Sequence, residues 1–130
     1  MLSEENIKKI KELCQKYPAI KLLYVFGSQT RGDAGPLSDY DFAVYLDEKD
    51  VPKRFSIKLE LMGELSLILH SDKIDVAVIN DVDNINLKYA IVSDGELLYG
   101  EAPCKMIVEA RILNEYFDFR IFIDQYQKTK

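Results

Sequence analysis

The sequence has no long apolar run and no secretory leader. None of the apolar stretches in its 130 residues approaches the roughly 20 residues that a membrane-spanning helix needs. The first residues, MLSEENIKKIKELC, place polar side chains at helical spacing and lack the apolar stretch of a signal peptide. We therefore expect a soluble, cytoplasmic protein without membrane contact.

Cysteine is scarce as well. Only Cys14 and Cys104 are present, and they lie far apart at a spacing that matches no metal-binding motif. In a protein that is not exported, two such cysteines are most simply buried thiols. This predicts a reducing compartment.

Basic residues are fewer than acidic ones. Lys and Arg together number 17 against 22 Asp and Glu, which gives a net charge of −5. Because polynucleotide binding depends on clustered cations, a long nucleic-acid partner is disfavoured. A nucleotide held through metal ions remains compatible with an acidic chain.

The chain alternates between amphipathic and apolar segments, as expected of one small domain over residues 1–130. The spacing of apolar residues and the positions of Pro and Gly predict these elements: helices at 3–17, 53–70, 84–92 and 103–126, and strands at 22–26, 41–46, 73–79 and 96–99. There is no internal repeat or linker.

Two of the expected helices carry apolar residues at the spacing of a buried face. In the helix that follows Pro52 the pattern predicts one stripe and a second row beside it: Phe55, Leu59, Met62 and Leu69, then Leu61, Leu65 and Ile68. In the last helix it predicts a core-facing stripe: Met106, Ala110, Leu113, Phe117 and Ile121. Further aromatic residues surround the last helix, which predicts contact with another chain: Tyr116, Phe119, Phe122 and Tyr126.

Two aspartates one residue apart, Asp39 and Asp41, lead into an apolar strand. This spacing places their Cα atoms about 6.5 to 7 Å apart on one side of a sheet, where both can converge on metal ions. Asp75 can join them if its strand is a neighbour. Because carboxylates inside apolar strands are costly without a partner, and three of them repel one another, the set predicts a site for divalent cations.

A second pair of this kind, Asp81 and Asp83, lies just before the helix expected at 84–92. Aspartate is common at helix N-termini, so we interpret this pair as a helix cap.

Gly27 and Ser28 come directly after the first apolar strand. Glycine lets the backbone approach a ligand closely, and exposed N–H groups beside a serine hydroxyl form a phosphate site. A plain strand-ending turn at Gly27 and a turn role for Asp39 are the alternatives.

Taken together, these residues resemble a known family. Gly27-Ser28, ten residues and then Asp39-x-Asp41 are similar to the G-S-x(10)-D-x-D signature of nucleotidyltransferases related to DNA polymerase beta, and Asp75 in KIDVAVI fits the third carboxylate. Residues 22–99 resemble the minimal nucleotidyltransferases, often called MNT antitoxins. The resemblance implies an α/β (α+β) fold, with a small mixed sheet of about four strands, flanking helices and a long C-terminal helix.

The resemblance also implies roles for single residues. Gly27 and Ser28 would bind the nucleotide phosphates, with Arg31 as a basic residue in the following turn. Asp39, Asp41 and Asp75 would hold about two Mg²⁺ ions, or Mn²⁺, and would be the catalytic carboxylates. Asp75 would also help to deprotonate the acceptor hydroxyl. Gln29 stands where many members have Arg or Lys.

The implied function is transfer of AMP from ATP to a tyrosine of a HEPN-domain RNase toxin, which silences the toxin. Residues 1–100 would be the catalytic core, and residues 103–127 would bind the toxin in a hetero-oligomer. Two alternatives stay open: transfer to a small molecule of the aminoglycoside type, and an antitoxin that acts by binding alone.

Overall fold

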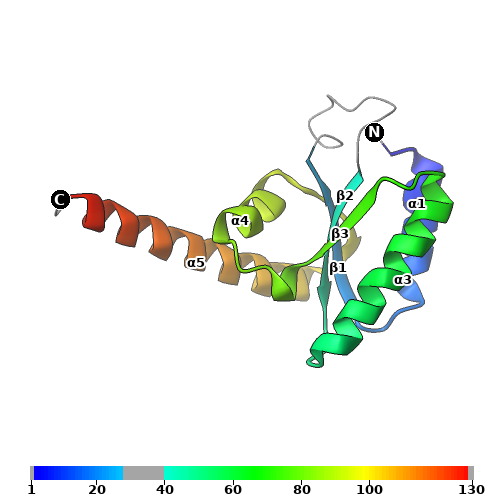
Figure 1. Cartoon of the computed structure of the whole chain (residues 1–130), viewed down its shortest axis with the longest axis horizontal. Coiled ribbons are helices and arrows are strands. Elements are labelled where there is room, and N and C mark those ends of the chain that lie inside the picture. Colours follow the sequence, from blue (N-terminus) through cyan, green and yellow to red (C-terminus); the bar gives the residue numbers. More distant parts are fainter. Residues whose placement is uncertain (1, 28–39, 129–130) are drawn as a thin grey trace.

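The computed structural model describes residues 2–27 and 40–128 (Figure 1). The elements follow one another in this order: α1 (Glu4–Gln15), β1 (Ile20–Phe26), β2 (Tyr40–Leu46), α3 (Val51–Leu69), β3 (Ile74–Val78), the short 3-10 helix η1 (Ile79–Asp81), α4 (Ile85–Asp94), β4 (Glu96–Gly100) and α5 (Ala102–Lys128). The expected α/β fold class with a long last helix is confirmed.

The four strands form one mixed sheet in the order β3-β2-β1-β4. β1 pairs antiparallel with both β2 and β4, whereas β2 and β3 are parallel. Figure 1 shows α1 and α3 on one side of the sheet and α4 and α5 on the other. Because β2 and β3 are parallel, both strands begin at the same end of the sheet.

The strands are apolar on both faces because both faces are covered. In β1, Leu23 and Val25 belong to the core beneath α1 and α3, and Leu22 and Tyr24 to the core beneath α4 and α5. Cys14 is buried in the first of these cores, as expected, and burial raises the pKa of its thiol to about 12. Cys104 is only half-buried.

Helix α3 fully buries only the last residue of its expected main stripe, Leu69, together with two residues of the row expected beside that stripe. Leu61, Leu65 and Leu69 are buried, whereas Phe55 is 56% and Leu59 51% exposed. The helix is apolar around most of its circumference, so the sequence pattern does not single out one face. The fully buried residues thus come from both expected rows, and Met62 and Ile68 pack partly buried against the same core.

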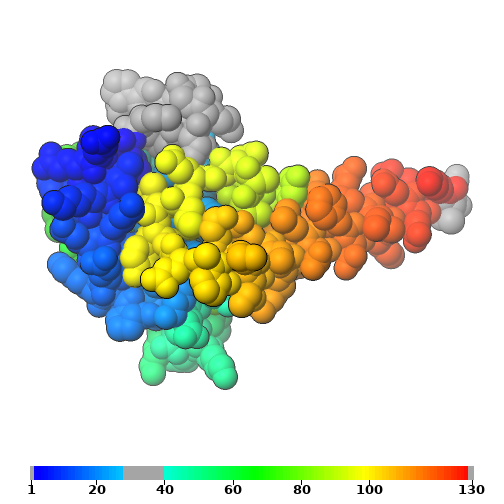
Figure 2. Space-filling model, turned by 180° about the vertical axis from the view of Figure 1, so that it is seen from behind, coloured from blue at the N-terminus to red at the C-terminus, as the bar shows by residue number. Residues whose placement is uncertain are grey.

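Helix α5 contacts the body of the protein over part of its length. Val108 and Ile112 are its buried residues, and Tyr116 stacks on Tyr89 of α4 with 3.8 Å between ring centroids. Beyond that point the helix projects away from the sheet (Figures 1 and 2). The expected core-facing stripe is therefore wrong in four of its five members: Ala110 is exposed, and three others are exposed by more than half, Met106, Phe117 and Ile121.

A partly buried hydrogen bond joins α5 to the sheet. The hydroxyl of Tyr24, in the middle of β1, donates to Oε2 of Glu109 at 2.5 Å. Burial, together with this carboxylate, raises the pKa of Tyr24, so the hydroxyl keeps its proton. Lys105 lies 3.2 Å from the other oxygen of Glu109 and completes the ion pair along the helix.

None of the helices within the described part of the chain is both long and apolar enough to cross a membrane.

The contrast within α3 can be measured with two leucine variants. We expect Leu65→Ala to lower the free energy of unfolding by about 2 to 5 kcal/mol, because it removes a buried side chain and leaves a cavity. Leu59→Ala, at a position 51% exposed, should change it by less than about 0.5 kcal/mol. Urea denaturation followed by circular dichroism measures both, and equal losses would contradict the burial described above.

Candidate active site

The end of β1 meets the beginning of β2 at a glycine. Phe26, the last residue of β1, is paired with Asp41, and Gly27 follows with a φ of +78°. A Cβ atom placed on Gly27 would lie 2.8 Å from Oδ2 of Asp41. Glycine is therefore required here for two reasons, the backbone conformation and the closeness of the carboxylate.

The second carboxylate comes from the neighbouring strand. β2 and β3 pair so that Asp41 lies directly opposite Asp75. Residues that are directly opposite in a sheet point to the same face, so both carboxylates lie on one side. The condition that the strand of Asp75 must be a neighbour is met, and the structure brings Gly27, Asp41 and Asp75 together.

The exposure of the two carboxylates differs from the buried setting that their apolar strands indicate. Asp41 is half-buried, whereas Asp75 is exposed on β3, which is the outermost strand of the sheet. The free-energy cost of a buried charge therefore does not support a site at Asp75. A site at Asp75 is supported instead by the position of this residue opposite Asp41.

The other expected site residues, Ser28, Arg31 and Asp39, lie outside the described residues. Within residues 2–27 and 40–128, no three His, Cys, Asp or Glu side chains gather closely enough to hold a metal ion. The described part of the expected metal site consists of Asp41 and Asp75.

The two described carboxylates suit a hard divalent cation. Mg²⁺ prefers oxygen ligands, commonly one or two carboxylates together with water and substrate phosphates. Asp41 and Asp75 offer such oxygens from opposite positions on adjacent strands, and the exposure of Asp75 leaves access for a phosphate. These residues could hold Mg²⁺ or Mn²⁺ beside a nucleotide.

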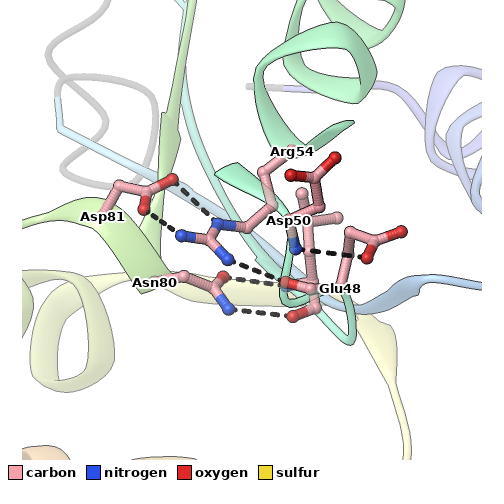
Figure 3. A network of polar contacts seen from close by, with 6 residues as sticks. Glu48, Asp50, Arg54, Asn80 and Asp81 are labelled. Carbon is pink, nitrogen blue, oxygen red and sulfur yellow. Dashed lines mark hydrogen bonds and ion pairs between the residues drawn. The ribbon is translucent and has the colours of Figure 1, made fainter. Parts of the chain in front are cut away.

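A polar network that sequence reasoning missed lies at the other end of the β2–β3 pair (Figure 3). In it Arg54 is bonded to Glu48 and to Asp81, and the adjacent Asn80 is bonded to Leu46. Asp81 accepts two hydrogen bonds from the Arg54 guanidinium. The interpretation of Asp81 and Asp83 as the cap of the next helix is therefore wrong: the N-cap of α4 is Asn84, whose side chain accepts from two backbone N–H groups.

Comparison with protein families gives one match over most of the chain. The family described as "Polymerase beta, Nucleotidyltransferase" matches residues 8–103. The protein adenylyltransferase MntA of Aphanizomenon flos-aquae is 33% identical over 96 residues, which is 68% of this chain and 63% of that protein. The chain thus matches less than two thirds of the length of MntA. A candidate protein adenylyltransferase of Methanocaldococcus jannaschii is 33% identical over 91 residues, 70% of this chain and 89% of that protein.

Solved structures with a similar fold include antitoxin chains from toxin–antitoxin complexes. A chain of a toxin–antitoxin crystal structure with AMP-PNP has a TM-score of 0.72 at 24% identity, covering 97% of this chain and 99% of the other. A chain of the complex between a tri-AMPylated Shewanella oneidensis HEPN toxin and its MNT antitoxin has a TM-score of 0.70 at 22% identity, covering 97% and 99%. At these identities the likeness concerns the fold. Together with the matched family and the placement of Gly27, Asp41 and Asp75, it confirms the resemblance inferred from the motif: the chain belongs to the polymerase beta nucleotidyltransferase family.

Proposed function

We propose that this chain is a metal-dependent protein adenylyltransferase that transfers AMP from ATP to a tyrosine hydroxyl of a cognate HEPN-domain toxin and thereby neutralises it. The observation that carries the proposal is the pairing of Asp41 with Asp75 beside Gly27 in a chain of this family. The choice of a protein acceptor is supported by the relative named protein adenylyltransferase and by the fold shared with an antitoxin bound to an AMPylated HEPN toxin.

In the proposed reaction, the tyrosine oxygen forms a bond to the α-phosphorus of ATP. The bond between that phosphorus and the oxygen bridging to the β-phosphate breaks, and pyrophosphate leaves. Asp75 accepts the proton of the tyrosine hydroxyl, a role for which its exposure is suitable because the acceptor arrives from outside. The reaction needs an aligned nucleotide more than it needs covalent chemistry from the protein.

The remaining residues of the site would bind and orient ATP. The backbone at Gly27, the hydroxyl of Ser28 and the side chain of Arg31 would hold the triphosphate, and Asp39, Asp41 and Asp75 would hold the cations. When bound, Mg²⁺ would neutralise phosphate charge and align the attacking and leaving oxygens, with about two ions as the usual number for in-line transfer.

The projecting part of α5 is proposed to bind the toxin, which makes residues 103–127 the partner-binding element of a hetero-oligomer. Phe119, Ile121 and Phe122 are 38%, 56% and 64% exposed. Isolated helical segments of this length are marginally stable in water, and exposed apolar groups on them are usual at protein interfaces. A bound toxin would both cover this surface and stabilise the helix.

Asparagine variants of the two described carboxylates test the transfer. We expect Asp41→Asn and Asp75→Asn each to reduce AMP transfer from ATP to the toxin by about 100-fold or more, because each removes a negatively charged metal ligand. The readout is the intact mass of the toxin after incubation with ATP and Mg²⁺. Asp83→Asn, which changes an exposed carboxylate in the loop before α4, is the control and should transfer at the parent rate.

Three outcomes would count against this proposal. An unmodified toxin in the parent reaction would exclude AMP transfer to it, and AMP found on an aminoglycoside instead would favour a small-molecule acceptor. Full neutralisation of the toxin by both asparagine variants would favour an antitoxin that acts by binding alone.

The glycine bend can be tested with a pair of alanine variants. Gly27→Ala places a Cβ 2.8 Å from Oδ2 of Asp41 at a φ of +78°, so we expect it to weaken binding of Mg²⁺ and AMP-PNP by about tenfold or more. Gly63→Ala is the matched control, because a Cβ at Gly63 has no atom within 4 Å. Isothermal titration calorimetry measures both, and unchanged binding in Gly27→Ala would remove Gly27 from the nucleotide site.

The proposed toxin-binding surface is tested by adding charge to it. We expect Phe119→Asp with Phe122→Asp to weaken toxin binding by about 100-fold, the effect of losing strong apolar contacts at an interface. Gln125→Asp with Gln127→Asp adds the same charge to exposed polar positions of the same helix and should change binding little. Biolayer interferometry with immobilised toxin gives the affinities. Equal losses in both double variants would point to charge alone as the cause.

A further inference from the structure

We propose that Asn80 is a positioning residue, which fixes the register between β2 and β3 and thereby holds Asp75 opposite Asp41. The inference rests on the proposed function for one point, the catalytic role of this carboxylate pair. The structural argument comes from the hydrogen bonds at the far end of the two strands.

The ladder between β2 and β3 runs from Tyr40 opposite Ile74 to Val44 opposite Val78. Two residues further along in the same register, Leu46 would face Asn80. Here β3 has ended and residues 79–81 form η1, so the strand no longer supplies a backbone partner.

The side chain of Asn80 takes the place of that backbone. The N–H of Leu46 donates to Oδ1 of Asn80 at 3.0 Å, and Nδ2 of Asn80 donates to the carbonyl oxygen of Leu46 at 2.8 Å. A carboxamide has the same donor and acceptor as a peptide group, so it can continue the ladder for one more position. Asp lacks the donor, and Ala lacks both groups.

Two further contacts fix the same junction (Figure 3). Nε and Nη2 of Arg54 donate to the two carboxylate oxygens of Asp81 at 3.1 and 2.5 Å, and Nη1 donates to the carbonyl oxygen of Glu48 at 2.8 Å. Bidentate pairs between guanidinium and carboxylate groups are directional as well as strong. Arg54 thus joins the residue after Asn80 to the loop that follows β2.

The register has few backbone restraints besides the ladder with β2, because β3 is a short edge strand. It has five residues, lies at the edge of the sheet and is paired with β2 alone among the strands of the described chain. A slip of one residue would turn Asp75 to the opposite face, and a slip of two would move it about 6.6 Å along the strand. Either slip would separate the carboxylates that are to share a cation.

Asn80 lies too far from the carboxylates to act on the substrate directly. The three extended positions from Asp75 to Val78 alone span about 10 Å, and Asn80 lies beyond them in η1. Its effect on the site must therefore pass through the position of β3, which is what distinguishes it from a catalytic residue.

The test uses the full chain with Asn80→Ala and Asn80→Asp. We expect both variants to weaken Mn²⁺ binding in the presence of AMP-PNP by about tenfold, the lower end of the effect seen when groups that orient metal ligands are removed. Electron paramagnetic resonance of free Mn²⁺ measures this binding. In amide hydrogen exchange, protection should fall by about tenfold or more in residues 74–78 and stay unchanged in residues 20–26.

Leu65→Ala is the control for a simple loss of stability, because it removes a side chain from the core on the face of the sheet opposite to the two carboxylates. It should lower stability and leave Mn²⁺ binding unchanged. Parent-like Mn²⁺ binding or parent-like exchange of residues 74–78 in Asn80→Ala would overturn the proposal, as would an equal loss of Mn²⁺ binding in Leu65→Ala. These readouts need no toxin, so a failure of AMP transfer in the parent chain would count against the proposed function and not against the role of Asn80.

Discussion

The parallel pairing of β2 with β3 determines where the two described carboxylates lie relative to each other. Asp41 and Asp75 are separated by a long helix in the sequence and are brought to opposite positions by this single ladder. Gly27 is the third described residue of the candidate site, because its backbone passes close to the carboxylate of Asp41. The proposed nucleotide site of this acidic chain would depend on cations for its charge balance.

The two faces of the sheet are covered by different helices. α1 and α3 pack on one face, where their buried side chains form a continuous apolar core with the strands. On the other face, α4 and the first half of α5 cover the middle of the sheet. The second half of α5 contributes little to this core and carries its apolar side chains outward.

Local sequence patterns predict most of the fold. Ser3, a residue type favoured at helix N-caps, accepts from the N–H of Asn6 at the start of α1, and strands and helices alternate as the spacing of apolar residues indicates. The buried faces of α3 and α5 could not be predicted as well. Both helices are apolar almost all around, so the contact with the sheet, and not the pattern, decides which row is buried.

The sequence predicts those site residues that belong to a local motif or that lie opposite one another on paired strands. Gly27, Asp41 and Asp75 could be selected from the sequence, because a strand end and two strand positions carry them. Asn80 and Arg54 could not, since their partners are 34 and 27 residues away and no periodicity marks them. Ser28, Arg31 and Asp39 remain predictions from the motif.

The position of Asp75 on the outermost strand has a consequence of another kind. An edge strand exposes unpaired backbone groups that can recruit a strand from a second molecule, and charged side chains discourage such additions. β3 is short and carries an exposed carboxylate at its second residue. The carboxylate that is proposed for the nucleotide site is thus also of a kind that discourages strand addition at this border of the sheet.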